Sequence, residues 1–311
     1  MNMRKKRMEA VNKNIGAIDI GSNGARLLIK NVYEDQMGNY GFTKVLFLRI
    51  PLRLGKDVFT LGRISEERET MMLRMIKSYK QLMKLYSVSR YRACATSAMR
   101  DAANGPDILK RIKRKTDIDI EIIGGREEAF LLYNCSIEGD PSCSGNYAYM
   151  DVGGGSTEIS MINDGKLVGS FSYNIGTIRI LSGAADPDVL ERLRRDMVAY
   201  SKQYKDITLI GSGGNINKLC RLYYEGVGKG RGKVLPVKAL RDIHDSLKPL
   251  SFKERMDRYG LKADRADVII PASEIFLEAA DSLGCQDIRV PNISLADGII
   301  DWIYKQEKCK A

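Results

Sequence analysis

The chain has 311 residues, 44% of them hydrophobic, which is enough for two domains that each bury a core. Its net charge of +11 predicts an anionic ligand, and the lack of a long apolar run argues against a membrane span or a secretion signal. We therefore expect a cytoplasmic location. The six scattered cysteines and the single histidine, His244, argue for reduced thiols and against a zinc site or a histidine-based triad.

The spacing of apolar residues predicts a mixed α/β first half. After a tail of about 12 residues we expect strands at 15–20, 25–32 and 43–50, a helix at 65–86 and a strand at 91–95. A helix from about 106, a strand at 118–123 and a helix at 126–137 follow. The basic segment LKRIKRK (109–115) has helix-spaced isoleucines and no aromatic residues, which favours a solvated helix face over nucleic-acid binding.

Two segments repeat one pattern: a strand that ends in Asp, a glycine-rich turn and a second strand. They are AIDIGSNGARLLI (17–29) and YMDVGGGSTEISMI (149–162), and a third glycine turn, LIGSGGNI (209–216), precedes a helix. One glycine turn alone is usually only a hairpin, but three together predict loops whose N–H groups converge on phosphate. None is a Walker or Rossmann loop, because no Gly-Lys-Ser/Thr follows and GGGSTE opens a strand.

Acidic residues stand beside these turns. Asp19 and Asp151 each stand two residues before the first glycine of their turn, where a carboxylate can hold Mg²⁺ while the adjacent amides bind phosphate oxygens. Glu158 lies on the returning strand and could share the ion; alone, it would be an ordinary strand residue. We therefore expect Mg²⁺ or another divalent cation.

Five motifs in order carry a family resemblance. They are DIGSNGARL (19–27), ATSAMRDAANG (95–105), IEIIGGREEAFLLY (120–133), DVGGGSTEIS (151–160) and GSGGNI (211–216). The chain resembles the exopolyphosphatase and guanosine pentaphosphate phosphohydrolase family, which belongs to the sugar kinase, Hsp70 and actin superfamily. The resemblance implies an α/β fold of two actin-like domains with the active site in the cleft between them. We place the domains at residues 1–131 and 132–295, with a C-terminal helix at about 296–311 packing back on the first.

The resemblance also implies roles for single residues. Glu128 matches the catalytic glutamate that positions or deprotonates the attacking water, although an exchange of roles with Glu127 stays open. Asp151 and Glu158 match metal-associated acids. The residues that match phosphate contacts are Arg26, Arg100, the weaker candidate Arg265, and the loop residues Ser22, Asn23, Gly153, Gly154, Gly155, Ser156, Ser212 and Gly213.

Three departures from the family pattern bear on function. Gly24 stands where serine is usual, and Asn215 follows Gly214 where threonine is common. The C-terminal domain of long members has no counterpart in these residues, so we expect a substrate with fewer phosphates.

Three hypotheses remain. The first is an Mg²⁺-dependent exopolyphosphatase that releases orthophosphate from short-chain polyphosphate. The alternatives are a guanosine pentaphosphate 5′-phosphohydrolase and a non-catalytic sensor of guanosine tetraphosphate or polyphosphate. Neither nucleic acid nor membrane is an expected partner, and a homodimer is compatible with the sequence.

Overall fold

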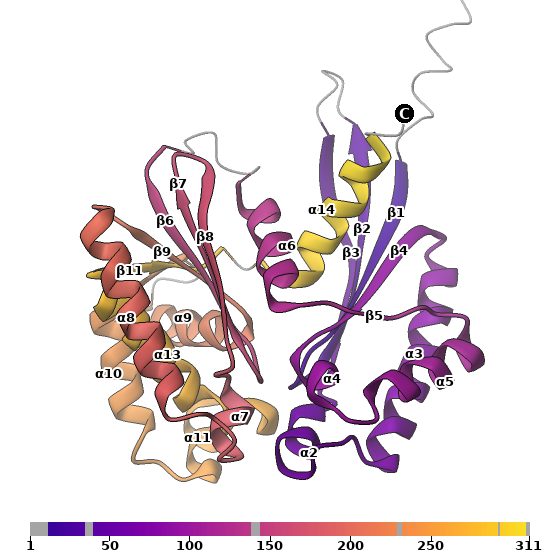
Figure 1. The fold of residues 1–311 in the computed structure, drawn as a ribbon, viewed down its shortest axis with the longest axis horizontal. Coiled ribbons are helices and arrows are strands. Elements are labelled where there is room, and N and C mark those ends of the chain that lie inside the picture. Colours follow the sequence, from indigo (N-terminus) through magenta and orange to yellow (C-terminus); the bar gives the residue numbers. More distant parts are fainter. Residues whose placement is uncertain (1–11, 35–39, 138–143, 229–231, 292, 309–311) are drawn as a thin grey trace, which may run out of the picture.

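The computed structural model describes residues 12–34, 40–137, 144–228, 232–291 and 293–308 of the chain (Figure 1). These residues form two β-sheets, of five and six strands, with helices packed around both. No helix in these ranges is long and apolar enough to cross a membrane.

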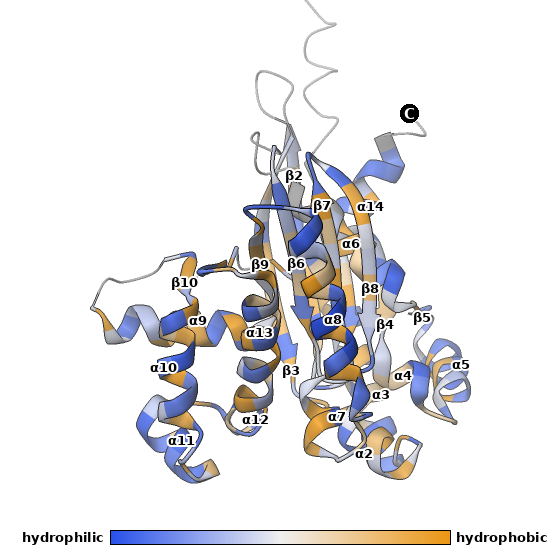
Figure 2. Ribbon diagram, turned by 60° about the vertical axis from the view of Figure 1, so that its left-hand side comes forward, coloured by the Kyte–Doolittle hydropathy of each residue, from blue (hydrophilic) through white to orange (hydrophobic). Residues whose placement is uncertain are grey.

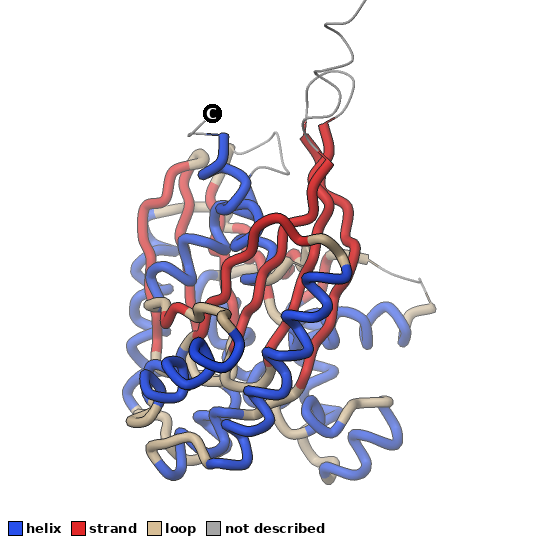
Figure 3. Tube along the Cα trace, turned by 90° about the vertical axis from the view of Figure 1, so that its right-hand side faces the viewer, coloured by secondary structure: helices blue, strands red, loops and turns tan. Residues whose placement is uncertain are grey.

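The first sheet has the strand order β3-β2-β1-β4-β5. Its strands are β1 (Asn12–Ile20), β2 (Ala25–Glu34), β3 (Tyr40–Ile50), β4 (Val88–Ala95) and β5 (Glu121–Ile122). The helices of this half are α2 (Leu54–Leu61), α3 (Glu66–Leu85), α4 (Ser97–Asp101), α5 (Gly105–Thr116) and α6 (Gly125–Ile137). The side chain of Ser65 caps α3, whose buried face packs with α5 against this sheet (Figure 3).

The second sheet has the order β10-β11-β9-β6-β7-β8. Its strands are β6 (Asn146–Val152), β7 (Thr157–Asn163), β8 (Lys166–Tyr173), β9 (Thr208–Ser212), β10 (Val234–Pro236) and β11 (Asp287–Arg289). The helices of this half are α7 (Thr177–Leu181), α8 (Asp188–Gln203), α9 (Gly214–Gly226), α10 (Val237–Leu247), α11 (Phe252–Tyr259), α12 (Ala263–Ala266) and α13 (Ile269–Leu283). The last helix is α14 (Leu295–Lys308).

The two sheets repeat one topology. In each, three antiparallel strands in succession are followed by a strand that pairs in parallel with the first of them: β1-β2-β3 with β4, and β6-β7-β8 with β9. A further parallel strand, β5 or β11, extends each sheet beyond β4 or β9. This is the duplicated α/β arrangement of actin-like domains, so the predicted fold class is confirmed.

Helices α6 and α14 lie between the two sheets (Figure 1). Their apolar residues, among them Leu131, Leu132, Ile299 and Ile300, share one buried cluster with residues of both sheets, including Ile15 and Tyr149. Figure 2 shows hydrophobic and hydrophilic colours alternating along helices such as α8 and α10, as expected for helices with one apolar face. Because α6 contacts β7 and β8 as well as α14, the boundary at residues 131 and 132 stays a prediction.

The predicted elements of the first half are observed, with differences at the ends. The strand expected at 118–123 is limited to β5, and the short helices α2 and α4 were not predicted. The cysteines at 94, 220 and 285 are free and buried; those at 135, 143 and 309 lie in ranges whose side chains are not described.

Candidate active site

A pocket opens between the two sheets, where β1 and β6 end in their glycine turns. Both halves contribute to its lining. The residues that line it are Asp19, Gly21–Gly24, Arg26, Arg49, Thr96, Ser97, Glu128, Asp151–Ser156, Thr177, Gly213–Asn215, Arg265 and Leu295.

The first two glycine turns have the same geometry. The Gly21 N–H donates to the Gly24 carbonyl at 3.1 Å, and the Gly153 N–H donates to the Ser156 carbonyl at 3.0 Å. The turns face each other closely, since a Cβ added at Gly154 would lie 3.0 Å from Ser22 Cβ and 3.2 Å from the Asn23 backbone nitrogen. The buried Ser22 Oγ has no hydrogen-bond partner among the described residues, so it is available to an anion.

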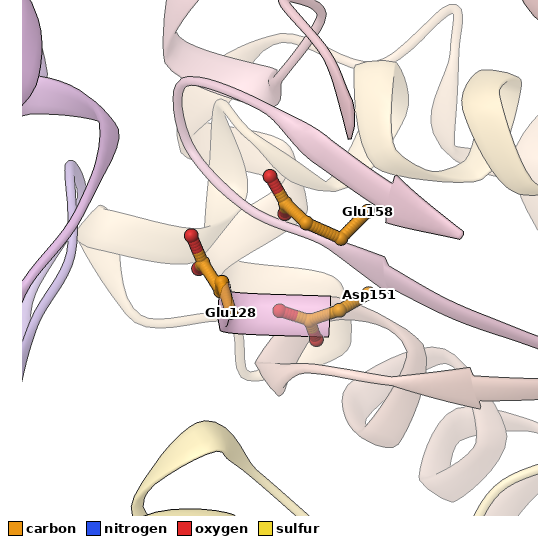
Figure 4. Close-up of side chains that lie close together, drawn as sticks. All are labelled: Glu128, Asp151 and Glu158. Carbon is orange, nitrogen blue, oxygen red and sulfur yellow. The ribbon is translucent and has the colours of Figure 1, made fainter. Parts of the chain in front are cut away.

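Three carboxylates converge on one side of this pocket. Asp151 on β6 is paired in register with Glu158 on β7, so both side chains leave the same face of the sheet. Glu128, from the first turn of α6, completes the group. Each residue offers one oxygen, and these oxygens lie within 4.8 Å of one another (Figure 4).

Serine hydroxyls hold two of these acids in place. Ser212, in register with Asp151, donates to its Oδ1, and Ser172, in register with Glu158, donates to its Oε1 at 3.0 Å. The second oxygen of Glu158, Oε2, is buried with no partner among the described residues. A Cβ at Gly213, whose φ is +100°, would lie 3.0 Å from Asp151 Oδ1. Ser212 and Gly213 thus support the carboxylate cluster.

Burial governs the protonation of the cluster. It raises the pKa of the Glu158 carboxyl to about 7; the charge of Asp151 adds to the increase, and the hydrogen bond from Ser172 opposes it. Burial and the charge of Glu158 raise the pKa of Glu128 well above its ordinary value, while Arg100 opposes the shift. The pKa of Asp151 is also raised by burial, and the Ser212 hydrogen bond opposes this.

The two adjacent glutamates of α6 face different surroundings. Glu128 is 7% exposed and lines the pocket. Glu127 points outward, with a side chain 44% exposed that pairs with Arg92 at 2.6 Å. Arg100 stands beside Glu128, donating to its Oε2 at 3.4 Å and to the Ile123 carbonyl at 2.7 Å, and it does not line the pocket. This geometry favours Glu128 as the catalytic residue.

The corresponding row of the first sheet is basic. Asp19, Arg26 and Arg49 are paired in register across β1, β2 and β3, at the positions equivalent to Asp151, Glu158 and Ser172. Arg26 forms an ion pair with Asp19, which therefore lies outside the three-carboxylate group. The duplicated sheets thus present an acidic wall and a basic wall to one cleft.

Comparisons with known proteins identify the family of the chain. A family model described as the Ppx/GppA phosphatase family matches residues 32–307. The chain belongs to the Ppx/GppA phosphatase family. Its predicted enzyme class, a hydrolase that acts on phosphoanhydrides, is confirmed at this level.

Individual proteins resemble the chain over different lengths. Exopolyphosphatase 2 of Mycobacterium tuberculosis is 27% identical, over 92% of this chain and 97% of that protein. The bifunctional 3-dehydroquinate synthase/phosphatase of Fusobacterium nucleatum is 34% identical over 53% of this chain, which spans only 25% of that protein. The crystal structure of the Aquifex aeolicus Ppx/GppA member has 27% identity and a TM-score of 0.75, over 95% of this chain and 98% of that one.

Both departures from the Ppx/GppA loop pattern lie beside arginines. A Cβ at Gly24 would come 3.1 Å from Arg49 Nη2. Asn215 Oδ1 accepts a hydrogen bond from Arg265 Nη1 at 2.8 Å, and a Cβ at Gly214 would lie 2.1 Å from Arg265 Nη2. Glycine at 24 and 214 therefore leaves room for guanidinium groups.

Sequence reasoning placed most of the pocket and missed some of its polar residues. The predicted residues that line it are Asp19, Ser22, Asn23, Arg26, Glu128, Asp151, Gly153–Ser156, Gly213 and Arg265. Glu158 and Ser212 do not line the pocket, but both lie next to Asp151, which does: Glu158 is paired with it in register, and Ser212 donates a hydrogen bond to it. Glu127 and Arg100 do not line the pocket either. Arg49, Ser97 and Thr177 were not predicted; for Arg49, the cross-strand register with Arg26 is the signal that could have found it.

Proposed function

We propose that the chain is an exopolyphosphatase that hydrolyses the terminal phosphoanhydride of inorganic polyphosphate and uses Mg²⁺ or a similar divalent cation. The observation that carries the proposal is the pairing of the two walls: a buried carboxylate cluster faces arginines and two glycine turns across one cleft. Phosphoryl transfer requires mainly positioning and charge neutralisation, which these groups supply.

The residues present fit a hard divalent cation. Asp151, Glu158 and Glu128 offer oxygens within 4.8 Å of one another, and Glu158 Oε2 is buried with no partner in the described part of the chain. Clustered like charges in a buried site are unfavourable unless a proton or a cation compensates them. When bound, the cation would neutralise charge on the phosphate being transferred and help to orient it.

The chain's own residues account for substrate placement and proton transfer. The amides of the two glycine turns and the Ser22 hydroxyl face the pocket and would bind the terminal phosphate. Arg26, held by Asp19, would neutralise its negative charge. Glu128, which is buried and lines the pocket, would accept a proton from the attacking water.

The experiment is to measure orthophosphate release from tripolyphosphate, long-chain polyphosphate and guanosine pentaphosphate, with Mg²⁺ and with a chelator. We expect metal-dependent release from a polyphosphate. Faster release from guanosine pentaphosphate than from either polyphosphate would show that the chain is a guanosine pentaphosphate 5′-phosphohydrolase instead. Binding of all three without release would instead indicate a sensor.

A further inference from the structure

Arg49 is the third residue of the basic row and has no role in the proposed hydrolysis so far. We propose that Arg49 is a further phosphate-binding residue that, together with Arg265, forms a second anion subsite for the phosphates behind the terminal one. This inference rests on the proposed function, since it concerns how the same pocket holds a phosphate chain.

The fold places Arg49 in the pocket. It is paired in register with Arg26 on the neighbouring strand, and Arg26 is paired with Asp19, so the three side chains leave one face of the sheet in order. Arg49 and Arg265 both line the pocket, one from β3 of the first sheet and one from α12 of the second half. A chain of phosphates bound at Arg26 can therefore continue toward these two guanidinium groups.

The contacts of Arg49 leave hydrogen-bond donors available. Its Nη1 pairs with Asp264 Oδ2, which fixes the guanidinium in the cleft. Its Nε is buried with no partner among the described residues, and its Nη2 lies beside Gly24, where any Cβ would be 3.1 Å away. Asp264 is thus a positioning residue for Arg49, and Gly24 leaves space where a larger residue would crowd the guanidinium.

The balance of charge in this part of the pocket also indicates an anion. Asp19 pairs with Arg26 and Asp264 pairs with Arg49, but no carboxylate of the described residues lies within 4.0 Å of Arg265. Burial and the charges of Arg49 and Arg26 lower the pKa of Arg265 to about 9, with Asp264 opposing the shift. A polyphosphate chain supplies negative charge at regular short spacing, which would relieve the repulsion among the three cations.

The test compares the binding of tripolyphosphate and orthophosphate by calorimetry, with Mg²⁺, to the full chain carrying Glu128→Gln. Adding Arg49→Gln should weaken tripolyphosphate binding about tenfold, the usual scale for a lost charge-assisted hydrogen bond, and leave orthophosphate binding within about twofold. Arg49→Lys should retain part of the tripolyphosphate affinity. Melting temperatures report whether each variant is folded.

Arg241→Gln is the matched control. Arg241 also forms an ion pair, with Asp281, but both residues belong to the second half and neither lines the pocket, so its loss should leave tripolyphosphate binding unchanged. Equal tripolyphosphate affinity with and without Arg49, or equal weakening of both ligands, overturns the second subsite while the proposed function stands. If the Glu128→Gln protein binds neither ligand and the unaltered enzyme releases no phosphate, the proposed function itself fails.

Discussion

Glu127 and Glu128 are neighbours in the sequence with opposite surroundings, one exposed beside Arg92 and one buried in the pocket. We predict that Glu128→Gln lowers kcat for polyphosphate hydrolysis about 1,000-fold, within the usual range for loss of a general base. Glu127→Gln, which keeps the same helix and removes only a surface ion pair, should change kcat less than about twofold. Steady-state phosphate release measures both.

The opposite ranking of these two variants would assign the proton transfer to Glu127. The sequence could not separate them, because both belong to one motif. What separates them is helical geometry: consecutive residues point about 100° apart, so only one of two neighbours can face the cleft.

Site residues could be predicted from the sequence where the residue type and its neighbours allow few other roles. Acids before glycine turns, such as Asp151, were identifiable because few other roles explain that pattern. Arg49 was not, since an arginine within an 11-residue strand is ordinarily a surface residue, and its place in the pocket depends on pairing with Arg26. Sites built by strand register are therefore harder to predict than sites built by one continuous loop.

At the scale of elements, the two glycine turns pack against each other across the cleft. A Cβ at Gly155 would lie 2.8 Å from Ser22 Oγ of the first turn, and 2.3 Å from Ser97 Oγ and 2.6 Å from Phe59 Cζ of the same half. We predict that Gly155→Ala pushes the turns apart and raises KM for polyphosphate by at least tenfold, with a smaller effect on the melting temperature. Gly62→Ala, where nothing lies within 4 Å but φ is +69°, is a stability control without contact with the cleft.

An unchanged KM for Gly155→Ala would mean that the turns do not hold substrate in this arrangement. The duplication of the turns was readable from the sequence because glycine, Asp and the flanking apolar strands recur together. The short helices α2 and α4 were not, because eight and five residues give too few turns for a periodic pattern.

At the scale of the whole molecule, Arg179 holds the two halves together. From α7 it donates to the Gly155 carbonyl at 2.7 Å, stacks on the Phe59 ring at 4.1 Å and pairs with Asp101 of α4. Because Arg179→Gln removes these contacts between the halves, we predict that it lowers kcat/KM about tenfold and increases proteolytic cleavage in α2, α4 and α7. A variant as active and as protease-resistant as the parent would contradict this role.

Arg194→Gln is the matched control for Arg179. Arg194 pairs with Glu278 at 2.6 Å, but both residues belong to the second half, so this ion pair does not cross the cleft. Its loss should leave kcat/KM and protease resistance near those of the parent, because exposed ion pairs contribute little to stability.

The metal-free protein should become less stable as the pH rises from 4.5 to 7. An ordinary salt-bridged acid has a lowered pKa and would make the protein less stable as the pH falls. The pKa of Glu158 is raised from 4.5 to about 7 in the folded state, mainly by burial, so between these values the folded chain binds more protons than the unfolded chain. The contribution of Glu158 to the free energy of unfolding is therefore fully present below pH 4.5 and is lost as the pH rises through 7. The loss is on the order of 3 kcal/mol.

Chemical denaturation in a chelator at pH 5, 6, 7 and 8 measures this effect as the difference between the parent and Glu158→Gln. The parent should lose unfolding free energy relative to the variant as pH rises, because glutamine has no proton to release. Mg²⁺ should restore the parent most at pH 8, where the ligands are deprotonated and the cation replaces the missing protons. A difference that stays constant across this pH range would show that Glu158 does not titrate in the buried cluster. Equal stabilisation of both proteins by Mg²⁺ would show that Glu158 does not share the ion, and would leave Asp151 and Glu128 as the acids that hold it.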